Sequence, residues 1–359
     1  MKNFTENRSI DLAHKIFNQR IEDSKIIWNK FSDKFILRNC PVCDNDDYIE
    51  LPEKFINLYP LAQCNICQTI YSNPCPNFEA ISYYYNNCLC NQMLHDLFKK
   101  RAKSNNDFVN DYRINKLVEL ILEKQSKLNS DKKDDEDDED DEDDGDDNDH
   151  QLNLLEIGCG TGAFLIKLLA RLKADKITGV NLCGIDIDQN ALDSCTEPEI
   201  TLMNNNAETF DHGRQYDFVI NFELIEHLID PTTFIQNIKN NLTDGGYFVM
   251  TTPNSLGLET KAIGYNSTRL IAHAIFPPMH LNAFNPRNIY YFLIKNGFKA
   301  HTVSTPGCLD VSICLNTIDE VDPIIKPIAD LDEKAQEMIQ TVTTYLDGSS
   351  HMFCVGQKI

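Results

Sequence analysis

Four cysteines near the N-terminus have the spacing of a metal site. Cys40 and Cys43 form one Cys-x-x-Cys pair, and Cys64 and Cys67 form a second pair after an interval of 20 residues. Two such pairs are typical of structural zinc sites, in which four thiolates at about 2.3 Å complete a tetrahedron and leave no position open for catalysis. A thioredoxin-like redox role would need a single pair at a helix start, and that context is missing. We therefore predict one structural zinc ion bound by these four cysteines.

A glycine-rich turn follows an apolar segment in the middle of the chain, in the sequence LLEIGCGTG. Its glycines, Gly158, Gly160 and Gly162, allow a tight turn and the close approach of a ligand. Their spacing is Gly-x-Gly-x-Gly, which differs from the Gly-x-Gly-x-x-Gly fingerprint of dinucleotide-binding proteins. Glu156, two residues before the first glycine, can reach a cationic group of a ligand but would repel a pyrophosphate. The turn therefore predicts a site for a small ligand that carries a positive charge.

A second acidic position lies at the end of the next predicted strand. Asp186 follows Gly162 by 24 residues, and a carboxylate at this point can accept hydrogen bonds from both hydroxyls of a ribose. Asp188 is expected to cap the helix that follows. Because the ends of adjacent parallel strands face one crevice, we expect Asp186 and the glycine turn to bind the same ligand.

Acidic and histidine side chains gather after two later predicted strands. Glu223, Glu226 and His227 follow the strand predicted over 216–223, and on a helix they would share one face. His280 follows the strand predicted over 245–254. Together these residues could bind a divalent metal ion. Two other interpretations remain open: Glu226 and His227 orient a substrate through a local hydrogen bond, or His227 acts as a general base. The other histidines, among them His351, are interpreted as structural.

These motifs, in this order, resemble those of class I S-adenosylmethionine-dependent methyltransferases. The resemblance extends over about residues 105–305 and includes the segments Asn206-Ala207-Glu208 and Tyr216-Asp217-Phe218-Val219. It implies that the three glycines pass under the methionine part of the cofactor and that Asp186 holds the ribose. It also implies that Asn206 and Ala207 border the adenine, where Asn206 replaces a common acid and accepts from the adenine amino group through its carbonyl oxygen.

The Glu-x-x-Glu-His pattern resembles metal-dependent O-methyltransferases, including small-RNA 2′-O-methyltransferases and ubiquinone-pathway enzymes. This resemblance implies a magnesium-like ion that holds the hydroxyl to be methylated, with Glu223, Glu226, His227 and His280 as its ligands. Glu226, His227 and His280 are accordingly the catalytic candidates. In addition, the cysteine pairs, an Asn-Pro-x-Pro turn at residues 73–76 and a run of tyrosines at 83–85 resemble the start of many bacterial-type class I enzymes, sugar C-methyltransferases among them. These resemblances do not name one substrate.

Alternating strands and helices from residue 151 onward predict an α/β fold with a mostly parallel sheet of seven strands and helices on both faces. We expect a Rossmann-like methyltransferase sheet preceded by a small zinc ribbon. An apolar face at Ile114, Leu117, Val118, Ile121 and Leu122 predicts a helix that ends near Gln125. The expected divisions are a helical arm (1–35), the ribbon (36–80), a helical linker with the first methyltransferase helix (81–128), a disordered acidic insert (129–150), the core (151–318), and C-terminal helices with the last strand (319–359).

Charge and hydropathy narrow the expected partners. The 359 residues carry a formal net charge of −22, and residues 131–149 contain 15 acids and two lysines. This balance argues against a broad nucleic-acid surface. No apolar run is long enough to span a membrane, and the first residues lack a signal-peptide core, so we expect a cytoplasmic protein with free thiols. No protein partner of the acidic tract follows from its composition.

The expected function is S-adenosylmethionine-dependent O- or C-methylation of a small or medium-sized acceptor, such as a sugar, a lipid or a secondary metabolite. One alternative is a metal-assisted RNA 2′-O-methyltransferase, against which the acidic charge counts. The other is a non-catalytic scaffold that binds the cofactor, and detectable turnover with any acceptor would exclude it.

Overall fold

The computed structural model describes residues 10–94, 108–135, 151–210, 213–263, 274–307, 310–316 and 326–359. Two sheets organise these residues: a four-stranded antiparallel sheet of order β1-β2-β3-β9, and a seven-stranded mixed sheet of order β10-β11-β8-β7-β4-β5-β6. The predicted α/β fold with a mostly parallel seven-stranded sheet and a small N-terminal cysteine module is confirmed. No helix in the described ranges is long and apolar enough to cross a membrane.

The chain folds as two compact units, and each unit is built from segments that are not contiguous in the sequence. The first unit contains Met1–Lys103, Asn221–Asn240 and Tyr247–Ile359, and the second contains Ser104–Ile220 and Asn241–Gly246. The N-terminal module therefore shares a unit with the second half of the chain, whereas the glycine turn belongs to the other unit.

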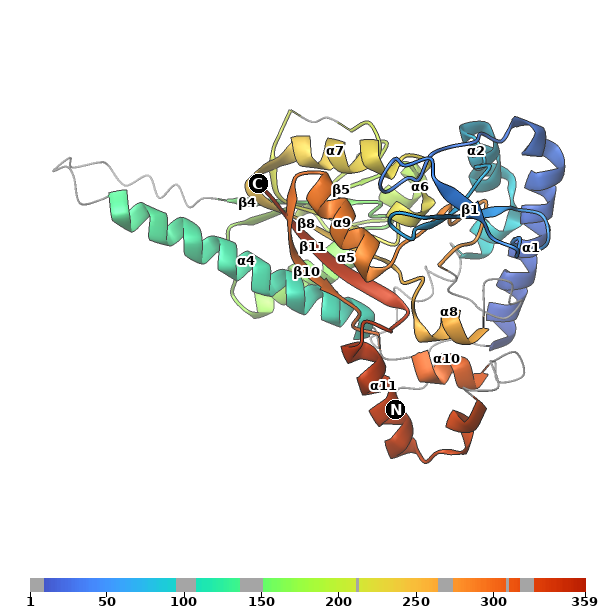
Figure 1. The fold of residues 1–359 in the computed structure, drawn as a ribbon. Coiled ribbons are helices and arrows are strands. Elements are labelled where there is room, and N and C mark those ends of the chain that lie inside the picture. The colour runs from blue at the N-terminus through green and yellow to red at the C-terminus, as the bar shows by residue number, and fades with distance from the viewer. Residues whose placement is uncertain are drawn as a thin grey trace. The chain divides into compact units, whose positions relative to one another are not determined.

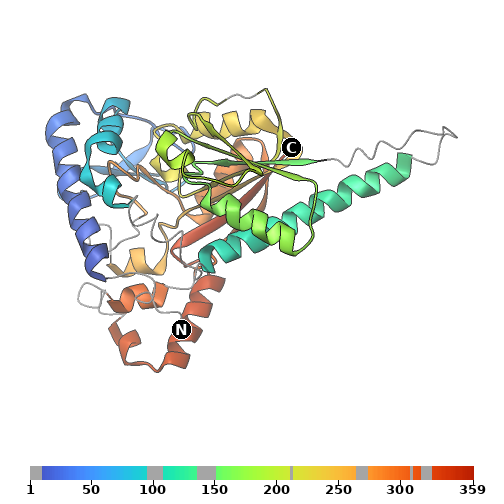
Figure 2. The same ribbon diagram turned by 180° about the vertical axis from the view of Figure 1, so that it is seen from behind.

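The second unit is built on parallel strands that end at the glycine turn. β4 pairs in parallel with β5, and β5 with β6, so their carboxyl ends lie at one edge of the sheet. Helices α4 and α5 pack against each other (Figure 2), and the Arg171 guanidinium donates to the Asn115 side chain at 2.6 Å. The elements of this unit are α4 (Phe108–Asp135), β4 (Leu152–Ile157), α5 (Ala163–Ala174), β5 (Val180–Asp186), α6 (Gln189–Leu192), β6 (Ile200–Asn204) and the first residues of β7 (Tyr216–Phe222).

Helix α4 differs from the sequence expectation in two ways. It continues to Asp135 instead of ending near Gln125, so its last residues overlap the segment predicted to be disordered. The rest of that segment, residues 136–150, lies outside the described residues. Leu117 and Ile121 are fully buried as expected, but Leu122 is 48% exposed because it lies off the packed face.

The first unit joins the cysteine module to the carboxyl half of the sheet. β8 and β10 both pair antiparallel with β11, and helices α8 and α10 lie side by side (Figure 1). The elements of this half are η3 (Ile225–His227), α7 (Pro231–Asn241), β8 (Leu242–Pro253), α8 (Leu258–Ile263), β9 (Asn282–Ala283), α9 (Pro286–Lys295), β10 (Phe298–Ser304), α10 (Asp310–Asn316), η4 (Lys326–Asp330), α11 (Glu333–Tyr345) and β11 (His351–Lys358).

The N-terminal helix packs on the cysteine module through an aromatic core. Phe17 of α1 contacts Phe276 edge-on at 5.8 Å, and Trp28 contacts Tyr59 at 5.1 Å. This cluster is buried and includes residues from α1, the module and the segment before β9. The elements of this part are α1 (Ile10–Phe31), η2 (Ser32–Lys34), β1 (Tyr48–Glu50), β2 (Leu61–Cys64), β3 (Ile70–Ser72) and α2 (Phe78–Asn87).

Candidate functional site

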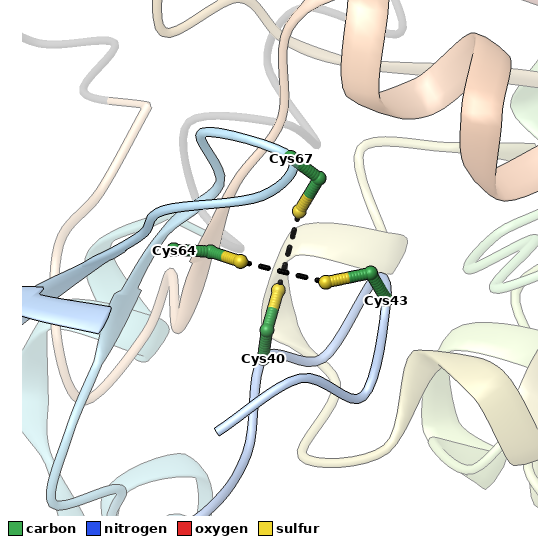
Figure 3. Close-up of side chains that lie close together, drawn as sticks. All are labelled: Cys40, Cys43, Cys64 and Cys67. Atoms are coloured by element: carbon green, nitrogen blue, oxygen red, sulfur yellow. Dashed lines mark hydrogen bonds between the residues drawn. The ribbon is translucent and has the colours of Figure 1, made fainter. Parts of the chain in front are cut away.

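The four predicted zinc ligands converge on one point (Figure 3). The sulfur atoms of Cys40 and Cys67 lie 3.4 Å apart, as do those of Cys43 and Cys64, and all four sulfurs lie within 4.8 Å of one another. A zinc tetrahedron with bonds of about 2.3 Å has sulfur–sulfur edges of about 3.8 Å, so the cluster fits the ion with small adjustments. The hydrogen bond with Cys40 lowers the pKa of Cys67 to about 5, which makes a thiolate ligand available at neutral pH.

Two equivalent turns hold the cysteine pairs. In the first turn the Asp44 N–H donates to the Cys40 carbonyl, and in the second the Gln68 N–H donates to the Cys64 carbonyl. Asp44 and Gln68 both have left-handed backbones, with φ of 63° and 61°. Each turn therefore folds the chain back so that both sulfurs of a Cys-x-x-Cys pair face the same side, which supports a metal site at this cluster.

The glycine turn has the backbone that its sequence requires. Gly158, Gly160 and Gly162 have φ values of 76°, 53° and 71°, a region in which a side chain is strained. Gly162 also caps α5, which begins at the next residue. A Cβ added at Gly160 would meet no atom of the described part of the chain within 4 Å. The turn thus leaves room for a ligand directly against the backbone.

Glu156 lies under this turn at the end of β4. Glu156 is 5% exposed, and its Oε2 has no hydrogen-bond partner among the described residues. Burial raises the pKa of Glu156 to about 8, with the Asp186 carboxylate adding to the rise and the Arg113 guanidinium opposing it. A cationic ligand would favour the ionised form of this buried acid. The buried oxygen therefore fits the ammonium end of S-adenosylmethionine.

Asp186 and its neighbours are arranged largely as the sequence predicts. Asp186 is half-buried at the end of β5, and its Oδ2 accepts a hydrogen bond from the Gly160 N–H at 2.8 Å. Asp188 caps α6 by accepting from the Asn190 and Ala191 N–H groups, which confirms that expectation.

The two residues expected to border the adenine follow β6, the neighbouring strand. Asn206 is exposed and Ala207 is half-buried. The Asn206 Oδ1 accepts from the Glu208 N–H at 2.8 Å, so one lone pair of this oxygen remains for an adenine amino group.

A second cluster contains Glu226, His227 and His280. Their potential ligand atoms lie within 4.8 Å of one another, and the two imidazole rings meet nearly perpendicular at 4.6 Å. Glu226 is fully buried, with Oε2 accepting from the Thr252 hydroxyl at 2.9 Å and Oε1 lying 3.7 Å from the His227 Nε2. Oε1 has no hydrogen-bond partner in the described structure, so one buried carboxylate oxygen is available to a ligand.

The charge state of this cluster follows from burial. Burial raises the pKa of Glu226 to about 8, and the Glu223 carboxylate adds to the rise. Burial lowers the pKa of His227 to about 4. At neutral pH the imidazole of His227 is therefore neutral, as required of a metal ligand or a general base. The Tyr85 hydroxyl lies 2.8 Å from the His227 Nδ1 and fixes the orientation of the ring.

Glu223 does not join this cluster, because residues 223–227 do not form an α-helix. Its backbone is left-handed, with φ of 55°, and only Ile225–His227 form a single 3-10 turn. The Glu223 Oε1 accepts from the Thr251 hydroxyl at 2.7 Å, and its Oε2 lies 3.3 Å from the His351 Nε2. The expected shared helical face of Glu223, Glu226 and His227 is therefore wrong.

Two residues at these sites were not among the sequence candidates. Tyr85 contacts His227 although 142 residues separate them. His351, interpreted from the sequence as structural, contacts Glu223 from the start of β11. Tyr85 lies in the tyrosine run at 83–85, and the resemblance of that run to other methyltransferases is the signal in the sequence that could have pointed to it.

The sheet, the glycine turn and the carboxylates at its edge define a class I S-adenosylmethionine-dependent methyltransferase. The family model described as "Methyltransferase domain" matches residues 94–303, and the chain belongs to this family. The match covers more than half of the chain and agrees closely with the range of the resemblance in the sequence.

Curated relatives are O-methyltransferases. The ubiquinone biosynthesis O-methyltransferase of Shewanella pealeana is 33% identical over 109 residues, which are 28% of this chain and 43% of that protein. The mitochondrial ubiquinone biosynthesis O-methyltransferase of Dictyostelium discoideum is 28% identical over 137 residues, 35% of this chain and 41% of that protein. The chain thus spans less than half the length of these relatives.

A solved S-adenosylmethionine-dependent methyltransferase from Mesorhizobium loti is also similar. It is 14% identical, with a TM-score of 0.39, and the match covers 58% of this chain and 91% of that one.

Proposed function

We propose that this methyltransferase transfers a methyl group to a hydroxyl oxygen of a small or medium-sized acceptor, with a divalent metal ion bound by Glu226, His227 and His280. The observation that carries the proposal is the convergence of these three side chains around a buried carboxylate oxygen that has no hydrogen-bond partner among the described residues. A site with two nitrogen ligands and one oxygen ligand binds magnesium or manganese less tightly than zinc. All three ions are nevertheless compatible with these ligands. The curated relatives are named as O-methyltransferases, which supports oxygen as the methylated atom.

Different residues of the chain would bind the cofactor and the acceptor. Glu156, the glycine turn and Asp186 would bind S-adenosylmethionine, with Asn206 and Ala207 beside its adenine. The sulfonium is already a strong electrophile, so the protein mainly orients the reactants and removes a proton. A bound divalent ion would supply a positive charge that favours the ionised form of the acceptor hydroxyl.

The tyrosine contact supports the role of His227. If Nε2, the nitrogen that faces Glu226, is the ligand atom, the Nδ1–H donates to the Tyr85 hydroxyl oxygen. Metal-binding histidines are commonly oriented by such a hydrogen bond from the second ring nitrogen. The Thr252 hydroxyl would hold the other oxygen of Glu226 in the same way.

A second candidate mechanism needs no divalent ion. The same Tyr85–His227 contact can keep a neutral imidazole in place as a general base, which would serve O- or C-methylation of a sugar, lipid or secondary metabolite. RNA 2′-O-methylation is less well supported, because a net charge of −22 opposes binding to a polyanion. The four cysteines would bind a structural zinc ion in either case.

Labelling separates these candidates. The full-length protein is incubated with methyl-labelled S-adenosylmethionine and with fractionated metabolites or RNA, in the presence of Mg²⁺ or of a chelator that leaves the cysteine site loaded. We expect label in a small-molecule fraction, loss of labelling in the chelator, and the same loss in Glu226→Gln. Labelling that persists in the chelator would favour His227 as a general base, and label confined to RNA would overturn the proposed acceptor class. No label in any fraction would favour the cofactor-binding scaffold.

A further inference from the structure

One arginine joins the cysteine module to the two chain segments that carry His227 and His280. Arg38 precedes Cys40 by two residues and is half-buried. Its guanidinium donates to the Ile229 carbonyl at 2.8 Å and to the Leu281 carbonyl at 3.0 Å. It also donates to the Asn282 side-chain oxygen at 2.8 Å. A single side chain therefore binds two backbone segments that are about 50 residues apart in the sequence.

These two segments are the ones that present the metal-ligand candidates. Ile229 lies two residues after His227, and Leu281 directly follows His280. The segments are also bonded to each other, because the Leu281 N–H donates to the Glu226 carbonyl at 2.8 Å. The side chain of the residue after Leu281, Asn282, adds a bond to the Leu228 carbonyl at 2.7 Å.

The opposite side of Arg38 is fixed by the cysteine module. Its backbone N–H donates to the Asn73 side chain at 3.1 Å, and its Nε donates to the Ser72 carbonyl at 3.3 Å. The first knuckle also contacts the chain near the histidines directly, because the Thr232 hydroxyl donates to the Pro41 carbonyl at 3.2 Å. A shift of the cysteine turn would therefore move the guanidinium and the carbonyls that it binds.

The chemistry of the side chain explains why arginine occupies this position. A guanidinium has five N–H donors in one rigid plane and can serve several acceptors at once. A lysine ammonium is a compact charge without this fork, so it could reach one carbonyl but not all of them. Ligand groups must be held to within about 0.5 Å of their productive positions, which requires rigid support behind them.

We propose that Arg38 is a positioning residue for His227 and His280, and that the four-cysteine site fixes the geometry of the histidine cluster through it. The cysteine module then acts as a scaffold for the second metal site. The reaction that the cluster serves is taken from the proposed function. The positioning of the two histidines by Arg38 does not depend on it.

The test compares Arg38→Gln and Arg38→Lys with a control that loses stability elsewhere. Asp332→Ala removes the N-terminal cap of α11, in which the Asp332 carboxylate accepts from the Ala335 N–H. Losing such a cap lowers the stability of the folded protein. All variants are used as full-length, zinc-loaded protein, at a temperature at which each is folded.

The first readout is the binding of Mn²⁺, followed by electron paramagnetic resonance. Mn²⁺ prefers oxygen and nitrogen ligands and leaves the four thiolates to zinc. Substitutions behind metal ligands typically weaken binding by about 10–100-fold, and we expect this loss in Arg38→Gln and in Arg38→Lys but not in Asp332→Ala. Equal affinity in all variants, or full affinity in Arg38→Lys, would overturn the proposal.

The second readout is the NMR signals of the His227 and His280 imidazoles. They are recorded with no divalent ion other than the zinc of the cysteine site and are assigned with His227→Gln and His280→Gln. We expect both signals to shift in the Arg38 variants and to stay in place in Asp332→Ala. If the wild type binds no Mn²⁺, the metal proposal fails, and these signals alone decide the role of Arg38. Unmoved signals would then refute it.

Discussion

The Asp186 carboxylate and the Gly160 amide are joined by a hydrogen bond of 2.8 Å. The second carboxylate oxygen accepts from the Asp188 N–H at 2.9 Å. The side chain expected to hold the ribose therefore also ties the end of β5 to the glycine turn. Loss of this carboxylate should disturb the cofactor site in two ways, through a missing ligand contact and through a looser turn.

We predict that Asp186→Ala weakens the binding of S-adenosylmethionine by about 10–150-fold, which corresponds to about 1.5–3 kcal/mol for a charge-assisted contact. Isothermal titration calorimetry measures the change. Asp188→Ala is the matched control, because it removes the helix cap two residues away, costs about 1 kcal/mol of stability and should leave the affinity unchanged. An unaltered affinity in Asp186→Ala would remove this residue from the cofactor site.

The raised pKa of Glu156 predicts a pH dependence of cofactor binding. Its pKa of about 8 means that the carboxyl group is protonated in the free protein at pH 7. A cationic ligand favours the carboxylate, so binding below pH 8 should release a proton. Between pH 8 and pH 6 the affinity should fall by up to about tenfold per pH unit.

Glu156→Gln tests this pH dependence. It cannot release the proton, so its affinity should be low throughout and nearly flat over the same pH range. Calorimetry in two buffers of different ionisation enthalpy measures the proton release directly. A wild-type affinity that is equally flat would show that Glu156 does not face the cationic part of the cofactor.

We predict one zinc ion per chain, bound by Cys40, Cys43, Cys64 and Cys67. Cys43→Ser should lose the metal and leave the module open to proteolysis, because a small loop-rich segment depends on its metal for folding free energy. Cys88→Ser, at a buried cysteine outside the cluster, should retain the zinc. Elemental analysis and limited proteolysis provide the measurements. A zinc-free wild-type protein with a protease-resistant module would contradict the assignment.

We also predict that the acidic insert is a spacer. The test replaces residues 136–149 with a short Gly/Ser linker, which keeps α4 complete to Asp135 and joins β4 at its amino end. Ligands bind at the carboxyl ends of such strands. Halving a flexible loop changes its closure free energy by only about 0.6 kcal/mol. The affinity for S-adenosylmethionine should therefore stay the same, and a loss of more than tenfold would place the insert in the site. The melting temperature should rise slightly at low salt, because like charges are removed.

Features set by a few neighbouring residues could be predicted from the sequence. The cap at Asp188, the turn at the glycines and the alternation of strands and helices follow from local propensity and apolar periodicity. The expected shared face of Glu223 and Glu226 failed because one left-handed residue, Glu223, breaks the helical geometry on which the argument depended. The helix α4 was predicted too short because its charged end has no apolar face to reveal it.

Contacts between distant segments could not be predicted. No periodicity links Tyr85 to His227 or His351 to Glu223, because these pairs depend on how whole elements pack. The same limit applies to Arg38, whose carbonyl partners are backbone groups and carry no signature of residue type.

The pairing of β3 with β9 places Tyr71 opposite Asn282, so the last strand of the small sheet comes from a segment about 210 residues later in the chain. At about 5–20 residues per second, a ribosome needs about 10–40 s to make the intervening stretch. During that time the edge of β3 is without its neighbour, and an open strand edge invites pairing with other chains. Early zinc loading would hold the nascent module together over this interval, so zinc shortage during synthesis should lower the yield of native protein.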